Sequence, residues 1–187
     1  LGEDEVKEIL STFSCPINAD VEKFLKEKAI EFSKREFSKT HLVFWETENK
    51  EEKEFVGYYT IAYKHITIYR KAINYKEARK LREHGIYNEK SSTYTIAAPL
   101  IAQLGKNFSN GNNTLISGDD LLNLAMEKIL KIRNEVGGRF AYLECEDKPK
   151  LIEFYEKNNF KKFGKRPLDR DETDLKGEYL LQYFIMI

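Results

Sequence analysis

The sequence has 187 residues, of which 41% are hydrophobic and 13% aromatic, and its 31 basic residues equal its 31 acidic residues. This length and composition predict one folded domain over residues 1–187 with a packed core, and they exclude a disordered chain. The formal net charge of zero gives no general preference for nucleic acid or an anionic membrane as a partner.

The cysteines indicate a reducing compartment, and the hydropathy indicates a protein without a membrane helix. Cys15 and Cys145 lie far apart in a chain that needs no disulfide, so both thiols are expected to be free. No stretch approaches the roughly 20 apolar residues that a membrane helix needs. The first ten residues are acidic and amphipathic and lack the basic start of a signal peptide. We therefore expect a soluble cytoplasmic protein without a membrane partner.

The first predicted helix begins near residue 18. Asn18 or Asp20 can act as its N-cap by accepting a hydrogen bond from the first turn. Apolar residues then recur at spacings of three and four, which gives the helix one buried face and one solvated, charged face. The apolar face consists of Val21, Phe24, Leu25, Ala29 and Phe32.

Two strands follow and are expected to form a hairpin. Residues 41–45 and 55–63 are rich in β-branched and aromatic side chains, and the polar run 46–54 predicts an exposed turn between them. Gly57 inside the second strand predicts a bulge or a close backbone approach. Residues 66–69 predict a short continuation as a strand.

A charged helix and a third strand come next. Residues 74–84 predict the helix, and Gly85 ends it. The strand lies within residues 91–105, where β-branched and apolar side chains are frequent. Pro99 has no N–H group, so one side of this strand is expected to lack a regular neighbour at that point.

The second half of the chain alternates helices and strands. Residues 121–136 predict the clearest helix, residues 139–145 a strand, residues 149–158 a short helix, and residues 160–163 and 180–187 two closing strands. This order implies an α+β fold with a mixed sheet and helices packed on it. The apolar face of the clearest helix consists of Leu121, Leu122, Ala125, Ile129, Ile132 and Val136.

No metal site is expected. The three histidines, His41, His65 and His84, do not have the spacing of metal ligands. The sequence contains no HExxH, CxxC or GxSxG motif. Neither a structural zinc site nor a serine-hydrolase nucleophile is therefore expected.

One stretch departs from the charged character of the chain. Residues 91–118 contain a single charged residue, Lys106, where proportional usage would give about nine. Residues 107–118 are polar and uncharged and lead into the clearest helix. Backbone N–H groups of such a loop, with the positive end of the helix dipole, can bind a phosphate. The alternative is a mobile loop that ends in a capping box between Ser117 and Asp120.

Two segments carry a family resemblance. Residues 151–160, Leu-Ile-Glu-Phe-Tyr-Glu-Lys-Asn-Asn-Phe, resemble the C-terminal motif of the GNAT family of N-acetyltransferases, in which a helix with a Phe-Tyr pair ends in a tight turn. Asn159 stands at the turn, where the family usually has glycine, and asparagine tolerates left-handed backbone geometry. Residues 113–118 match the family's pyrophosphate loop, Gln/Arg-x-x-Gly-x-Gly/Ala, with Ile116 at the first glycine position and the last glycine, Gly118, retained.

The resemblance implies a GNAT-like fold, a central mixed β-sheet of about six to seven strands flanked by helices. It also implies acetyl-CoA as the co-substrate. In this family two parallel strands, here residues 94–106 and 139–145, splay apart, and the pantetheine arm fills the gap. By this analogy the backbone of Leu104, Gly105 and Lys106 binds the pantetheine. The pyrophosphate site would consist of Asn113, Thr114, Leu115, Ile116, Ser117 and Gly118.

The resemblance also assigns catalytic roles. Tyr155 would be the general acid that protonates the departing thiolate, and the alternative is a core-edge tyrosine whose hydroxyl caps a carbonyl. Glu144 and Glu146 are the nearest candidates for the general base, although both also suit solvated surface positions. Cys145 raises a ping-pong alternative through an acetyl-cysteine.

We therefore expect a bacterial-type N-acetyltransferase that transfers acetyl directly to a primary amine, with a small-molecule or peptide amine as the acceptor. Residues 13–40 and 55–59 are similar to toxin-type GNATs, which acetylate charged tRNA, so aminoacyl-tRNA is the leading alternative acceptor. A non-catalytic acyl-CoA-binding regulatory module and an interaction domain without a cofactor are further alternatives. The apolar residues 183–187 predict either an inner strand or pairing with a second subunit in a homodimer.

One pattern counts against tRNA. The local basic cluster is interleaved with Glu77 and Glu83, whereas a tRNA-binding protein should present a basic stripe and a steep salt dependence. The basic residues of this cluster are Lys76, Arg79, Lys80 and Arg82.

Overall fold

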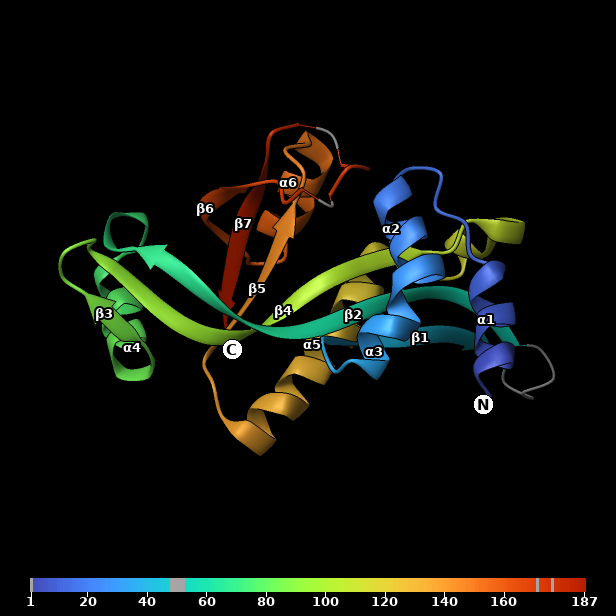
Figure 1. Cartoon of the computed structure of the whole chain (residues 1–187), viewed down its shortest axis with the longest axis horizontal. Helices are drawn as coiled ribbons and strands as arrows, with labels where there is room; N and C mark the ends of the chain where they lie inside the picture. The colour runs from blue at the N-terminus through green and yellow to red at the C-terminus, as the bar shows by residue number, and fades with distance from the viewer. Residues whose placement is uncertain (1, 48–52, 171, 176) are drawn as a thin grey trace. The chain divides into compact units, whose positions relative to one another are not determined.

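The structure is a computed structural model that describes residues 2–47, 53–170, 172–175 and 177–187. The predicted turn within 46–54 falls largely on residues 48–52, outside the described residues. The helices, labelled as in Figure 1, are α1 (Glu3–Ser11), α2 (Ala19–Lys23), η1 (Phe24–Lys28), α3 (Ala29–Lys34), η2 (Arg70–Ala72), α4 (Tyr75–His84), η3 (Ser109–Thr114), α5 (Gly118–Val136) and α6 (Pro149–Lys157). The strands are β1 (Ser38–Glu46), β2 (Lys53–Tyr69), β3 (Ile86–Asn88), β4 (Thr93–Lys106), β5 (Phe140–Cys145), β6 (Lys161–Pro167) and β7 (Tyr179–Met186).

The strands pair in a mixed sheet, as predicted. Among the described residues, the sheet has seven strands in the order β1-β2-β4-β5-β7-β6, with β3 paired to β4. β4 and β5 are parallel, whereas the pairs β1–β2, β5–β7 and β6–β7 are antiparallel. β7 lies between β5 and β6, so the apolar end of the chain is an inner strand. The homodimer stays a prediction.

The chain divides into two compact units, which differ in the elements they contain. The first unit comprises residues 1–62 and 102–127, and the second comprises residues 63–101 and 128–187. β2, β4 and α5 contribute residues to both units. The single domain over residues 1–187 stays a prediction.

The first unit is built around an apolar cluster between its N-terminal helices and the β1–β2 hairpin. The side chain of Asn18 caps α2 by accepting a hydrogen bond from the N–H of Val21 at 3.3 Å, which confirms the predicted helix start. The helix continues through the π-helical turn η1 into α3, which packs against β1. The sequence pattern did not predict α1. The buried members of the cluster are Leu10, Phe13, Cys15, Val21, Phe24, Leu25, Ala29, Phe55 and Tyr58.

Gly57 has the close backbone approach that its position predicted. The register of the hairpin shifts there, because Val43 pairs with Gly57 but Phe44 pairs with Phe55. A Cβ atom on Gly57 would lie 2.7 Å from the carbonyl oxygen of Gly105, which is closer than two such atoms can approach. The bulge and the glycine together allow β2 and the end of β4 to lie in contact.

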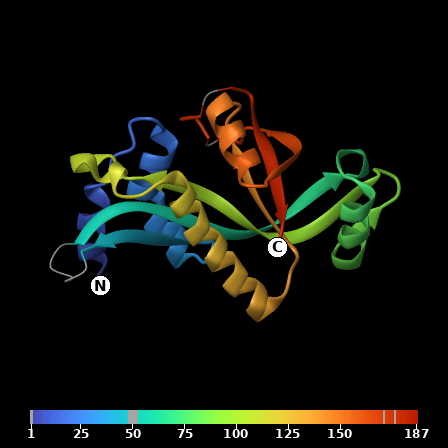
Figure 2. The same cartoon turned by 180° about the vertical axis from the view of Figure 1, so that it is seen from behind.

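In the second unit, both predicted helices and the closing strands are confirmed. α4 begins after the N-cap Asn74 and ends at Gly85, and α6 has Pro149 in its first turn. α6 lies beside β5 and β7 in both views (Figure 1 and Figure 2). Pro99 falls between two ladders of β4, since pairing with β3 ends at Thr95 and pairing with β5 begins one residue after the proline.

Two details of the second unit differ from the sequence prediction. β3 has only three residues, too few to show a strand period, and was not predicted. Val136, expected on the apolar face of its helix, is 67% exposed, because it is the last helical residue before Gly137, whose φ is 82°. Within the described ranges, no helix is both long and apolar enough to cross a membrane.

Candidate active site

The predicted site residues fall into two groups. The cofactor residues, from Leu104 to Gly118, belong to the first unit, and the catalytic candidates Glu144, Glu146 and Tyr155 belong to the second. Each group has its own chemistry, with backbone groups prominent in the first and ionisable side chains in the second.

The end of β4 contains the three predicted pantetheine residues. The parallel ladder with β5 pairs Leu100 with Tyr142 and Ile101 with Leu143, while β4 continues to Lys106. Gly105 is fixed by packing, because an added Cβ would overlap Cγ1 of Val21 and would lie 3.2 Å from the ring of Tyr58. Only glycine fits here, a constraint that single-sequence reasoning missed.

The first half of the uncharged loop is structural. Asn107 is 1% exposed; its side chain donates to the carbonyl of Phe55 at 2.8 Å and accepts from the N–H of Ser14 at 3.0 Å. Asn112, 7% exposed, donates to the carboxylate of Glu54 at 2.9 Å. These asparagine side chains connect the loop to β2 and to the segment after α1, so they have a structural role.

The second half of the loop ends in the predicted capping box. The N–H of Asp120 donates to Oγ of Ser117 at 3.0 Å, and the N–H of Ser117 donates to Oδ2 of Asp120 at 3.2 Å. The N–H of Gly118, the first residue of α5, makes no hydrogen bond within the part of the chain that the structure describes. Leu115 is 39% exposed and Ile116 is half-buried. Asn113 is half-buried as well, and Thr114 donates to a backbone carbonyl within the loop.

The start of α5 fits a phosphate in part. A helix of 19 residues has a positive N-terminal end, and the N–H of Gly118 is available there. The backbone of Lys106 lies near the first turns of α5. The Cα of Lys106 and Cδ2 of Leu121 both lie 3.4 Å from the place that a Cβ atom on Gly57 would take. Lys106 makes no ion pair within the described residues. The carboxylates of Asp119 and Asp120 in the first turn oppose an anion, so the site combines two favourable groups with two unfavourable groups.

Tyr155 lies on α6 in an aromatic setting. Its ring centroid is 5.0 Å from that of Phe154, 6.0 Å from that of Phe160 and 6.3 Å from that of Tyr183. Burial raises the pKa of Tyr155 well above its ordinary value, so the hydroxyl keeps its proton at neutral pH. This hydroxyl makes no hydrogen bond among the described residues, so the alternative in which it caps a carbonyl is not supported.

The end of α6 has the turn that the resemblance required. Asn159 has a φ of 65°, in the left-handed region, and the N–H of Phe160 donates to the carbonyl of Tyr155 at 3.0 Å. This closing bond holds the backbone of Tyr155 at the helix end. Asn159 therefore adopts the left-handed backbone conformation for which the family motif usually has glycine.

Glu144 lies inside an ion-pair network. Its Oε2 accepts from Nε of Arg166 at 2.7 Å, and its Oε1 accepts from the side chain of Gln182 at 2.8 Å. Arg166 also binds Glu172 through both terminal nitrogens, at 2.8 and 2.7 Å, and these hydrogen bonds raise the pKa of the guanidinium above its ordinary value. Both carboxylate oxygens of Glu144 are thus engaged, which favours a structural role over that of a base.

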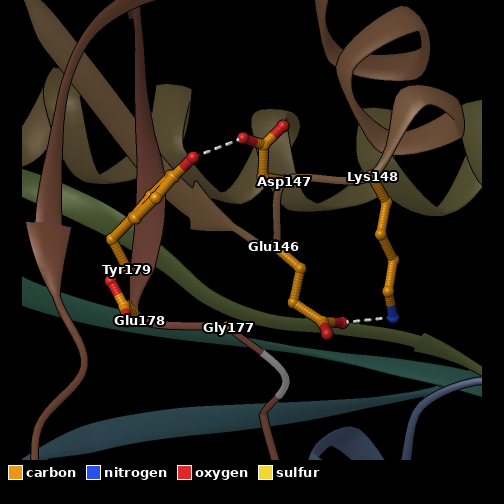
Figure 3. Close-up of a pocket in the computed structure, with 6 residues that line it drawn as sticks. All are labelled: Glu146, Asp147, Lys148, Gly177, Glu178 and Tyr179. Carbon is orange, nitrogen blue, oxygen red and sulfur yellow. Dashed lines mark hydrogen bonds and ion pairs between the residues drawn. The ribbon is translucent and has the colours of Figure 1, made fainter.

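Glu146 lines a pocket of about 300 Å³ in the second unit (Figure 3). It is 5% exposed, and its carboxylate accepts from Lys148 at 2.6 Å. Across the pocket, the hydroxyl of Tyr179 donates to Asp147 at 2.7 Å. Three carboxylates against one ammonium make the pocket suited to a positively charged group. Its lining consists of Glu146, Asp147, Lys148, Gly177, Glu178 and Tyr179.

The two cysteines are free and buried, as predicted for their redox state. Burial raises the pKa of Cys145 to about 12, with a smaller contribution from Asp147. A thiol with this pKa is protonated at neutral pH and is a poor nucleophile. Burial of the thiol therefore disfavours an acetyl-cysteine intermediate. No group of ligands that could hold a metal ion is present in the described ranges.

Neither a family model nor a curated protein matches the sequence, whereas solved structures share its fold. AtaT complexed with acetyl-methionyl-tRNAfMet has a TM-score of 0.61 at 18% identity, over 95% of this chain and 86% of that chain. A tyrosine-to-phenylalanine mutant of KacT has a TM-score of 0.61 at 16% identity, over 95% and 86%. AtaTR bound with AcCoA has a TM-score of 0.57 at 17% identity, over 98% and 88%.

These likenesses confirm the predicted fold. AtaT is named as a toxin in another of these structures, and this chain has the GNAT-like fold of AtaT and KacT.

Proposed function

We propose that this chain is an acetyl-CoA-dependent N-acetyltransferase whose acceptor is the amino group of an aminoacyl-tRNA. The observation that carries the enzymatic part is Tyr155, a protonated tyrosine without a hydrogen-bond partner among the described residues, on a helix that ends in the left-handed turn of the family motif. The fold shared with AtaT, which was solved with acetyl-methionyl-tRNAfMet, supports the acceptor. This acceptor replaces the small-molecule or peptide amine as the leading hypothesis.

The cofactor would be held mainly by backbone groups of the first unit. Leu104, Gly105 and Lys106 would present their backbone to the pantetheine amides, and the N–H of Gly118 would bind a phosphate oxygen. The ammonium of Lys106 would add a counter-charge, a role that the sequence did not suggest. Acetyl-CoA supplies the thioester that is attacked.

The side chains of the second unit would move the protons. The amine enters the pocket as an ammonium, and Glu146 accepts one of its protons. The neutral nitrogen forms a bond to the acetyl carbon while the carbon–sulfur bond breaks. The departing thiolate takes the proton of the Tyr155 hydroxyl. The nitrogen, positively charged once it is bonded to the acetyl carbon, releases its second proton to solvent, and Tyr155 regains a proton from solvent. A carboxylate-rich pocket suits the charged form of the amine that must first bind.

The proposal is tested by mixing the protein, acetyl-CoA and an aminoacyl-tRNA, and measuring free CoA together with the mass of the aminoacyl group. We expect stoichiometric CoA release and one added acetyl on the amino group. An amino-acid methyl ester in place of the tRNA measures the chemistry without the RNA. Acetyl-CoA binding without CoA release from any amine would instead support the non-catalytic module.

A further inference from the structure

Residues 63–93, here called the basic arm, concentrate the positive charge of the chain. The arm contains the end of β2, η2, α4 and β3, all within the second unit (Figure 1). It has eight lysine and arginine residues against three glutamates, a formal charge of +5. Since the whole chain has a formal charge of zero, the remaining residues carry −5. The neutral total conceals a strong asymmetry.

The structure removes one of the acidic residues from the surface of the arm. Glu77 is 6% exposed, and its carboxylate accepts from the N–H of Asn74 at 2.8 Å and from Lys161 at 2.9 and 2.8 Å. In the sequence this glutamate interrupts the basic cluster of α4, but in the fold it points inward. The interleaving that counted against a polyanion is therefore weaker on the folded surface.

Four of the six residues on the outward face of α4 are basic. Ala78 and Leu81 are buried, and the residues at spacings of three and four on the opposite side are Tyr75, Lys76, Arg79, Lys80, Arg82 and Glu83. Lys76, Arg79 and Lys80 make no ion pair among the described residues, and Arg82 lies over the ring of Tyr87 at 5.8 Å. By contrast, the exposed cations of the first unit's helices are mostly paired, for example Arg35 with Glu31 at 2.9 Å.

Exposed aromatic side chains accompany these cations. Tyr75 is 75% exposed at the start of α4, and Tyr69 is 54% exposed at the end of β2. Exposed tyrosines beside unpaired cations are typical of surfaces that bind nucleic acid, where phosphates meet the cations and bases meet the rings. A surface that only kept the protein soluble would need neither the exposed tyrosines nor the unpaired cations.

From this charge complementarity we infer that the outward face of α4 docks the phosphate backbone of RNA. This inference rests on the proposed function, because the RNA is the one whose aminoacyl end is acetylated. Three unpaired cations along one helix face, spaced for successive contacts, would bind phosphates without reading the base sequence.

The test is the salt dependence of binding to an unacylated tRNA transcript, without acetyl-CoA. The variant Lys76→Gln/Arg79→Gln/Lys80→Gln should reduce the slope of log affinity against log salt by about two to three and weaken binding about 10- to 1000-fold at low salt. The matched control Lys34→Gln/Arg35→Gln/Lys39→Gln removes the same charge from exposed residues of the first unit that are already ion-paired. It should leave the slope within one unit of that of the parent chain.

Two further measurements separate the outcomes. Turnover of an amino-acid methyl ester should be unchanged in the arm variant, and its melting temperature should stay within a few degrees of the parent. Equal tRNA affinity and slope in parent and arm variant would overturn the inference, whether or not the chain acetylates tRNA. A change of oligomeric state in the arm variant would also overturn it, since the face would then bind a second copy. Arm-dependent tRNA binding without any acetylation would refute the proposed function and leave the docking surface standing.

Discussion

The two units of the chain use polar residues in opposite ways. In the first unit, the buried amides of Asn107 and Asn112 form hydrogen bonds within the fold. The groups that can still bind a ligand there are backbone groups, in particular the N–H of Gly118. In the second unit, Glu146 lines a pocket. The hydroxyl of Tyr155 makes no hydrogen bond among the described residues. Ligand binding and proton transfer therefore depend on different kinds of group, and substitutions should separate them.

Tyr155→Phe gives the largest expected effect and tests the catalytic side of the comparison. Turnover should fall by at least tenfold, and by about 10²- to 10⁴-fold if the hydroxyl is a full general acid. Because the hydroxyl makes no hydrogen bond within the described residues, stability and acetyl-CoA affinity should stay close to those of the parent. Steady-state kinetics and calorimetry measure both.

The matched control for this variant is Tyr183→Phe. Tyr183 is also buried, and its hydroxyl is bonded only at 3.4 Å, to Glu156. Its loss should change turnover by less than about threefold. Equal losses in the two variants would show that removing either buried hydroxyl lowers turnover, and would contradict a specific role for the proton of Tyr155.

Asn107→Ala tests the structural side of the comparison. The change leaves the N–H of Ser14 and the carbonyl of Phe55 without their partner, so the free energy of unfolding should fall by about 2–4 kcal/mol. Urea denaturation measures the loss. Asn113→Ala, in the same loop but without a hydrogen bond of its side chain among the described residues, should stay within about 0.5 kcal/mol. Similar values for both would contradict the structural role of Asn107.

Glu146→Gln sharpens the comparison within the second unit. Turnover at neutral pH should fall about 10- to 100-fold, and the loss should shrink as the pH rises past about 8, where a free α-amino group is already neutral. Glu144→Gln should instead lower the melting temperature, because it weakens the pair with Arg166, while turnover is largely kept. A pH-independent loss in Glu146→Gln would remove this residue as the base.

Asp120→Asn gives the smallest expected effect. The substitution removes a negative charge from the first turn of α5, so the dissociation constant of acetyl-CoA should fall about two- to fivefold. Titration calorimetry at low salt measures the change. Glu135→Gln, near the other end of the same helix, should leave the constant unaltered. Weaker binding in Asp120→Asn would show that the capping box shapes the loop more than its charge opposes the phosphate.

The sequence predicted well whatever depends on neighbouring residues. The caps at Asn18 and Gly85 and the box between Ser117 and Asp120 follow from local backbone chemistry, and the left-handed turn at Asn159 is the one that the family resemblance implied.

The structural role of the Asn107 and Asn112 side chains was not predicted from the sequence, and phosphate binding by this loop stays a prediction. The partners of Asn107 lie 93 and 52 residues away, at Ser14 and Phe55. The pair of Glu144 with Arg166 spans 22 residues and shows no spacing pattern. Glu77 forms a local capping box with Asn74, but its ion pair with Lys161 spans 84 residues and has no spacing pattern in the sequence. Pairings across the fold leave no trace in a single sequence.

The most direct test of the central claim is a single-turnover reaction of the protein with acetyl-CoA and methionyl-tRNA, followed by mass analysis of the released aminoacyl group. We expect one acetyl group on the methionine nitrogen, one free CoA for each acetyl transferred, and loss of the product in Tyr155→Phe. Undiminished product in that variant, or intact acetyl-CoA after mixing with the parent chain, would contradict the claim.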